Sequence, residues 1–208
     1  MSGELVHTVI VAPPDDIGPE LAAAIGVEAT HLGSEALAPP TLPAADRLVW
    51  IHWMPGHAQE AMPLEEAQRV LASVDAAEGA ARAAGARLVF IALLPSQGLI
   101  EGRLGEACEL ARGATRGLLE SRIEAWSQCG WRLLGLVRGG VEGIRAEGER
   151  DPEAVRKRTP ADRAATLAEL AGPIRYLGSE RAAYVTGTFL HVDGGWRAYS
   201  WIYPARTI

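Results

Sequence analysis

The 208-residue sequence contains a single lysine, Lys157, and no tyrosine before Tyr176. Any mechanism that needs a phenol or a lysine amine earlier in the chain is therefore excluded. Positive charge is also sparse: the net charge is −6, and residues 156–158 form the one block of like charge. The composition thus gives no sign of a broad basic surface, and we expect no nucleic-acid partner.

Long apolar runs are missing as well. The longest, such as residues 88–95, fall far short of the ~20 residues needed to cross a bilayer, and no charged segment leads into an apolar one at the N-terminus. The two cysteines, Cys108 and Cys129, accompany no secretory signal, so we predict reduced thiols. We expect a cytoplasmic protein of one domain, without membrane contact.

Short apolar runs alternate with longer segments of helical periodicity. The predicted strands are 5–11, 27–32, 47–53, 88–94, 131–137 and 189–192. The predicted helices run from Asp15 or Asp16 to Gly26, and over 63–85, 105–126 and 161–177. Strands joined by helices need crossover connections, which predicts an α/β fold with a parallel sheet and helices on both faces.

Five short motifs follow one another towards the C-terminus. They are Arg158-Thr159-Pro160, Glu169-Leu170-Ala171, Tyr176-Leu177-Gly178-Ser179-Glu180, Ala183-Tyr184-Val185-Thr186-Gly187 and Val192-Asp193-Gly194-Gly195. In order and spacing they resemble the end of a short-chain dehydrogenase/reductase. The resemblance implies a Rossmann-like, doubly wound sheet over residues 1–195. It also implies a truncation, because the chain lacks room for the strand-helix unit that the family places before the strand at 47–53.

The resemblance also locates the loop that would bind a dinucleotide. Family members have a glycine-rich loop after the first strand, where backbone N–H groups hold the pyrophosphate. This sequence has Pro13, Pro14, Asp15 and Asp16 there, and only Gly18 remains. Prolines remove N–H donors and carboxylates repel phosphate, so we expect this chain to bind no cofactor, with NAD(P) held by a partner subunit.

The catalytic residues that the resemblance implies are a Ser, a Tyr, a Lys four residues after the Tyr, and an assisting Asn. The corresponding positions hold Leu93, with Ser96 close by, then Cys108, Arg112 and Ser73. A guanidinium cannot donate a proton near neutral pH, and a thiol lacks the reach of a phenol. We therefore expect no catalytic residue of the family type.

The segment 196–208 forms an aromatic tail that contains Trp196, Tyr199, Trp201 and Tyr203. Trp and Tyr are common at interface hot spots. Family members form dimers and tetramers partly through the last strand and tail, so we predict a subunit interface here. The alternative is that the tail folds back on its own domain.

Together these features predict a catalytically inactive subunit that oligomerises with an active short-chain dehydrogenase, with itself, or with both. In kind it resembles the inactive subunit of a dehydrogenase that acts on benzylsuccinate-type CoA thioesters, which makes acyl-CoA compounds a candidate substrate class of the partner.

Two other classes of function stay open. One is a cofactor-independent lyase or isomerase that uses Asp15, Asp16, His52 or Cys108 in the cleft. The other is a homo-oligomer that binds a small ligand there. His52 and His57 match no ligand spacing of a known metal site, so we predict no metal.

Overall fold

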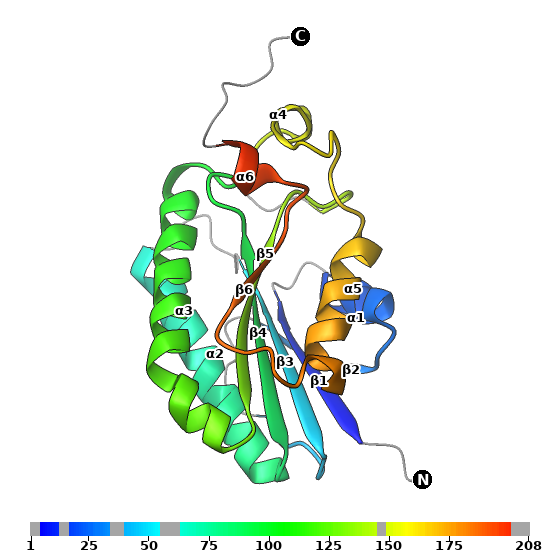
Figure 1. Cartoon of the computed structure of the whole chain (residues 1–208), viewed down its shortest axis with the longest axis vertical. Coiled ribbons are helices and arrows are strands. Elements are labelled where there is room, and N and C mark those ends of the chain that lie inside the picture. Colours follow the sequence, from blue (N-terminus) through cyan, green and yellow to red (C-terminus); the bar gives the residue numbers. More distant parts are fainter. Residues whose placement is uncertain (1–4, 13–16, 34–39, 55–62, 145–148, 201–208) are drawn as a thin grey trace.

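The computed structural model describes residues 5–12, 17–33, 40–54, 63–144 and 149–200. Its centre is a six-stranded sheet in the order β2-β1-β3-β4-β5-β6, in which every neighbouring pair is parallel (Figure 1). The strands are β1 (Val6–Ala12), β2 (Ala29–Gly33), β3 (Arg47–Trp53), β4 (Arg87–Pro95), β5 (Arg132–Arg138) and β6 (Phe189–Val192).

Helices cover both faces of this sheet, with α2 and α3 on one face and α1 and α5 on the other (Figure 1). The helices are α1 (Ile17–Ile25), α2 (Pro63–Ala84), α3 (Gly102–Gln128), α4 (Pro152–Arg158), α5 (Leu167–Gly178) and α6 (Trp196–Ser200), with a 3-10 turn η1 (Glu180–Ala182). The predicted Rossmann-like α/β fold is confirmed.

Two apolar clusters, one on each face, explain why the strand sequences carry so few polar residues. Successive side chains of a strand point to opposite faces. In β3, Trp50 therefore packs under α2 and α3, whereas Ile51 packs under α1 and α5. Every residue of β3 and of β5 is buried, as expected for interior strands of a parallel sheet.

The predicted helix over 161–177 is wrong at its start. Helix α5 begins at Leu167, because Thr166 accepts a hydrogen bond from the Glu169 N–H and the Glu169 side chain accepts one from the Thr166 N–H. Asp162 has a φ of 59°, which no helix allows. Helix α4 is absent from the helices predicted above, and it begins where Asp151 caps the N–H of Glu153.

Trp196 belongs to the domain rather than to a separate tail. Its side chain is 1% exposed, packs with Leu99 and Val155, and donates a 2.9 Å hydrogen bond from Nε1 to the Gln97 carbonyl. For Trp196 the structure favours the alternative that this part of the tail folds back on its own domain, so the packed domain extends past the boundary predicted at residue 195. Tyr199 is half-buried, and Trp201 and Tyr203 lie outside the described residues.

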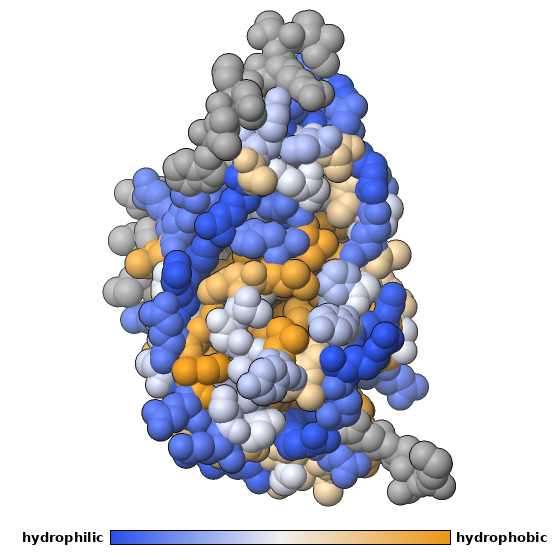
Figure 2. Space-filling view, viewed as in Figure 1, coloured by the Kyte–Doolittle hydropathy of each residue, from blue (hydrophilic) through white to orange (hydrophobic). Residues whose placement is uncertain are grey.

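Strand β6 is an edge of the described sheet, and its side chains are only partly buried. Figure 2 shows apolar side chains gathered on this face of the molecule, between α3 and α5. Leu190 of β6 is 36% exposed, and Tyr184, just before the strand, is fully exposed. Exposed apolar surface beside a strand edge is typical of surfaces that associate.

Cys108 is buried and Cys129 is exposed, and both are free thiols, as predicted. Within the described ranges, no helix combines the length and apolar character that spanning a bilayer requires.

Candidate functional site

The carboxyl edge of the sheet, around β1 and β3, is where a fold of this topology forms its ligand crevice. The chain leaves β1 to build β2 on one side and then returns to build β3 on the other, and ligands bind outside the strand ends at such a switch point. Pro13, Pro14, Asp15 and Asp16 follow β1 but lie outside the described residues, as does His57.

His52, near the end of β3, is buried in the core. The imidazole is 1% exposed, and neither ring nitrogen has a hydrogen-bond partner among the described residues. Burial, and after it the positive charge of Arg69, lowers the His52 pKa to about 4. The ring is therefore neutral at pH 7 and closed off from solvent, so the structure does not present it as an acid or base in an open cleft.

A buried cation fills the carboxyl edge between β3 and β5. The Arg138 side chain is fully buried, and its guanidinium carbon lies 5.0 Å from the centroid of the Trp53 ring. Arg138 also pairs with Glu149 at 3.4 Å and donates a 3.0 Å hydrogen bond to the Gly139 carbonyl. No ligand ring fits between Arg138 and Trp53, and the pair closes this part of the crevice.

Gly18, the glycine that the loop retains, lies against the next strand. A Cβ at residue 18 would be 2.7 Å from Nδ1 of the His31 ring in β2. A larger residue at position 18 would therefore have to displace the His31 side chain, which is exposed. The rest of the loop that would hold a pyrophosphate, residues 13–16, lies outside the described residues.

The predicted Cys108 and Arg112 lie four residues apart on α3. Cys108 is 1% exposed, so its thiol faces the core. The Arg112 guanidinium donates a 2.6 Å hydrogen bond to the Pro95 carbonyl at the end of β4 and pairs with Glu109 at 3.3 Å. Desolvation lowers the Arg112 pKa, partly offset by Glu109. This face of α3 therefore offers a structural cation and a buried thiol.

The other two predicted positions do not join this group. Leu93 is fully buried in the cluster under α1 and α5, on the face of the sheet opposite to α3. Ser73 of α2 is fully buried and accepts a 2.9 Å hydrogen bond from Nε1 of Trp50. Leu93 and Ser73 are therefore part of the packed interior of the domain.

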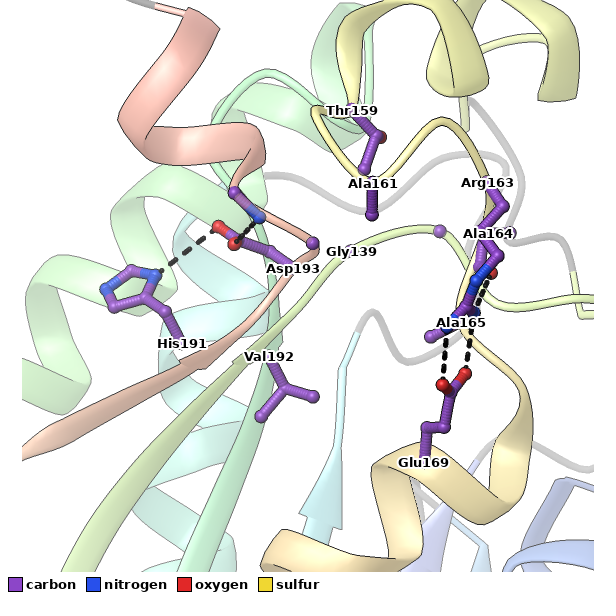
Figure 3. Close-up of a pocket in the computed structure, with 13 residues that line it drawn as sticks. Gly139, Thr159, Ala161, Arg163, Ala164, Ala165, Glu169, His191, Val192 and Asp193 are labelled. Atoms are coloured by element: carbon purple, nitrogen blue, oxygen red, sulfur yellow. Dashed lines mark hydrogen bonds and ion pairs between the residues drawn. The ribbon is translucent and has the colours of Figure 1, made fainter.

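Ser96, in contrast, contacts polar side chains that are distant in sequence. Its hydroxyl donates a 3.2 Å hydrogen bond to Oδ2 of Asp193, which also accepts from the Arg197 N–H at 3.1 Å. His191 Nδ1 is 3.7 Å from the same oxygen, and His191 Nε2 lies 2.8 Å from an Arg197 guanidinium nitrogen. Figure 3 shows His191 and Asp193 turned towards each other.

This cluster is not arranged to activate a nucleophile. The Ser96 hydroxyl points to the carboxylate, whereas activation requires a bond to the imidazole. Because Arg197 only donates, Nε2 of a neutral His191 accepts, and burial together with Arg197 lowers the His191 pKa. Asp193 belongs to the Val-Asp-Gly-Gly motif that supported the family resemblance, but the motif alone does not indicate this network.

A cavity of about 230 Å³ adjoins the cluster, between the ends of β5 and β6 and the loop before α5. Its walls include Gly139, Gly194, Asp193 and an ion pair of Arg163 with Glu169 (Figure 3). The hydrogen bond from Arg163 is the main reason why the Glu169 pKa falls to about 2. The cavity is large enough for a small polar molecule. Among the described residues, no group of three possible metal ligands occurs.

These features define a Rossmann-like α/β protein in which Trp53 and Arg138 occupy part of the carboxyl edge and a cavity lies at the ends of β5 and β6. The sequence profile of a family described as Enoyl-(Acyl carrier protein) reductase matches residues 70–197. The chain therefore belongs to the short-chain dehydrogenase/reductase family, and its similarity is to oxidoreductases.

Curated relatives match over part of their length. An uncharacterized short-chain type dehydrogenase/reductase of Sinorhizobium fredii is 32% identical over 117 residues, which cover 54% of this chain and 21% of that protein. The 2-dehydro-3-deoxy-D-gluconate 5-dehydrogenase of Bacillus subtilis is 32% identical over 108 residues, which cover 50% and 41%. The chain thus spans well under half of the length of these relatives.

Solved structures agree over most of the fold. An oxidoreductase of the family from Burkholderia thailandensis has a TM-score of 0.69 at 19% identity, covering 95% of this chain and 94% of that one. A gluconate 5-dehydrogenase from Burkholderia cenocepacia, in complex with NADP and tartrate, has a TM-score of 0.65 at 21% identity, covering 92% and 95%. At these identities the likeness shows the fold alone.

Proposed function

We propose that this chain is a non-catalytic subunit that assembles with an active short-chain dehydrogenase and supports it. The observation that supports the proposal most strongly is the environment of Cys108 and Arg112 on α3. Cys108 and Arg112 stand where the family has its Tyr and Lys, the thiol is buried, and the guanidinium is bound to the Pro95 carbonyl. In this proposal neither side chain gives a proton to a substrate, because the thiol is buried and the guanidinium is held by the Pro95 carbonyl.

The packing of the carboxyl edge supports the same proposal. Trp53 and the buried Arg138 occupy space outside the ends of β3 and β5, where a ligand of this fold would bind. Opening the edge would break the buried pair of Arg138 with Glu149, which costs several kcal/mol in typical proteins. Turnover of NAD(P) therefore belongs to the partner in this proposal.

The surface supports association. The β6 edge and the exposed apolar side chains beside it, Leu190 and Tyr184, suit a second subunit. The partner is an active paralogue in the cytoplasm, and acyl-CoA thioesters are the candidate substrate class. Copies of this chain can also pair with one another through the same surface.

The test is coexpression of this chain with a dehydrogenase encoded beside its gene, followed by calorimetric titration with NADH and NADPH. The expected result is a stable mixed oligomer with one nucleotide site per heterodimer, and no binding by the isolated chain. Recovery of this chain only with itself would reject the mixed assembly. Micromolar binding by the isolated chain would reject the account of the carboxyl edge.

A variant of each subunit shows which of the two subunits is responsible for any activity of the complex. Replacing the catalytic Tyr of the partner with Phe should abolish turnover, because the proton donor is then lost. Cys108→Ser in this chain should leave kcat and KM unchanged. A loss of turnover with C108S, in a complex that still assembles, would instead support the cofactor-independent enzyme.

The cavity of about 230 Å³ favours a second candidate, a protein that binds a small polar ligand at the ends of β5 and β6. A small molecule that raises the unfolding temperature of the isolated chain, without turnover, would support it. Because this cavity is lined by Asp193 and Glu169, the same ligand should lose affinity when Glu169 is replaced by Gln.

A further inference from the structure

Three arginines begin three neighbouring strands at the amino edge of the sheet, opposite to the crevice. Arg47, Arg87 and Arg132 are the first residues of β3, β4 and β5. Arg47 lies directly beside Arg87 in the register, and Arg132 lies beside Val89. The residues two positions further along each strand belong to the cluster under α1 and α5, so all three arginines lie on that face.

Two of these arginines cap the end of helix α5. Arg47 donates a 2.8 Å hydrogen bond to the Gly178 carbonyl, and Arg132 donates to the carbonyls of Leu177 at 2.7 Å and Ala182 at 2.9 Å. A helix C-terminus carries partial negative charge and favours cations. The burial of Arg47 and Arg132 is therefore explained by structure, and both guanidinium groups are fixed in place.

The third arginine, Arg87, stands at the rim of an open cavity. The cavity holds about 200 Å³ and is lined by all three arginines, Glu180, Val89, Gly130 and Ala183. The side chains of Arg87 and Glu180 are 49% and 50% exposed and form a 2.9 Å ion pair, and Glu180 also pairs with Arg47. Among the described residues that line the cavity, three are thus basic and one is acidic.

The three positive charges repel one another across this cavity and together make it electropositive. Desolvation lowers the pKa of Arg132, and the neighbouring positive charges of Arg47 and Arg87 lower it further, against the effect of Glu180. Like charges on neighbouring strands destabilise a sheet unless an anion lies between them. The carboxylate of Glu180 provides one such anion and leaves an open, solvent-facing space beside it.

We propose that this cavity, lined by Arg47, Arg87 and Arg132, binds a phosphate group, carried by inorganic phosphate or by a phosphate monoester. Guanidinium groups bind phosphate oxygens through pairs of parallel hydrogen bonds, and they do so best where they are held in place. A bound phosphate would join β3, β4 and β5 to the turn after α5. The site is independent of the function proposed for the opposite edge.

The experiment compares thermal unfolding of the full chain in sodium phosphate, in phenyl phosphate and in sodium chloride at equal ionic strength. Phosphate should raise the unfolding temperature in a saturable way, beyond the effect of chloride, because it binds the folded state alone. Equal affinity for both phosphates assigns recognition to the phosphate group itself, whereas tighter binding of phenyl phosphate assigns a monoester. A rise no larger than that in chloride would overturn the proposal.

Two variants with opposite expected effects separate binding from folding. Arg87→Gln should weaken phosphate binding at least about tenfold, because a rim charge is lost. Glu180→Gln should strengthen phosphate binding, because the competing carboxylate is removed. Arg116→Gln, on the exposed face of α3, is the matched control and should change nothing. Weaker phosphate binding in both R87Q and E180Q, with R116Q unaffected, would mean that the cluster only caps α5, and the proposal would fail.

Discussion

The indole N–H of Trp50 donates a 2.9 Å hydrogen bond to the hydroxyl of Ser73, and both side chains are fully buried. Replacing Ser73 with Ala leaves the indole N–H without this partner in an apolar cluster. We expect the free energy of unfolding to fall by about 1–3 kcal/mol. Urea denaturation followed by circular dichroism measures the change, and Ser121→Ala on the exposed part of α3 is the control. Equal midpoints for the two variants would contradict the role given to Ser73.

His52 should make stability depend on pH. Its pKa is about 4 in the folded protein, below the 6.5 of an exposed histidine, so the unfolded chain binds the proton more tightly. The contribution of neutral His52 to the free energy of unfolding is fully present above pH 6.5 and is lost as the pH falls towards 4. The expected loss between pH 7.5 and pH 5 is about 2 kcal/mol. His52→Leu should remove this part of the pH dependence, and the exposed His31→Gln should not. The midpoints of urea denaturation at the two pH values measure this change in stability. If H52L loses as much stability between pH 7.5 and pH 5 as the unchanged protein, burial of His52 is not the cause.

The buried pair of Arg138 with Glu149 should behave as a unit. Replacing Arg138 with Met leaves the Glu149 carboxylate without this partner, and a loss of about 3–5 kcal/mol is expected. Glu149→Gln alone should also destabilise, whereas the double variant should lose less than the sum of the two. A double-mutant cycle from urea denaturation gives the coupling energy. Strict additivity would show that the pair contributes no interaction of its own.

The start of helix α5 should depend on Thr166. Thr166→Ala removes the cap on the Glu169 N–H, so we expect a loss of about 1 kcal/mol. Thr166→Ser keeps the hydroxyl and is the matched control, with a midpoint close to that of the unchanged protein. Thermal unfolding measures both variants, and a T166A midpoint equal to that of T166S would contradict the capping box.

The positions of most strands could be predicted from the sequence, because buried parallel strands appear as continuous apolar runs such as residues 47–53 and 88–94. The ends of the helices could be predicted less well. Two start signals are present in the sequence, Thr166 with Glu169 three residues later and Asp151 before Pro152, but the apolar spacing over 161–177 alone does not locate them.

The polar contacts of the carboxyl edge were beyond sequence reasoning for a different reason. Arg138 and Trp53 stand on strands separated by β4, and Ser96 and Asp193 are 97 residues apart. Such pairings follow from the packed fold, since no local pattern encodes them. Trp196 was assigned to an interface because its residue type is common there, whereas its surroundings in the fold, Leu99 and Val155, decide where it lies.

The contact of Ser96 with Asp193 bears on how the chain acquires its shape during synthesis. The upper part of the sheet, with Leu99 and Trp196 packed together, cannot close until residue 196 has left the ribosome. Contacts of long sequence separation form late and leave apolar surface open while they wait. A nascent chain that ends before residue 196 would therefore lack these contacts and expose apolar surface that favours aggregation.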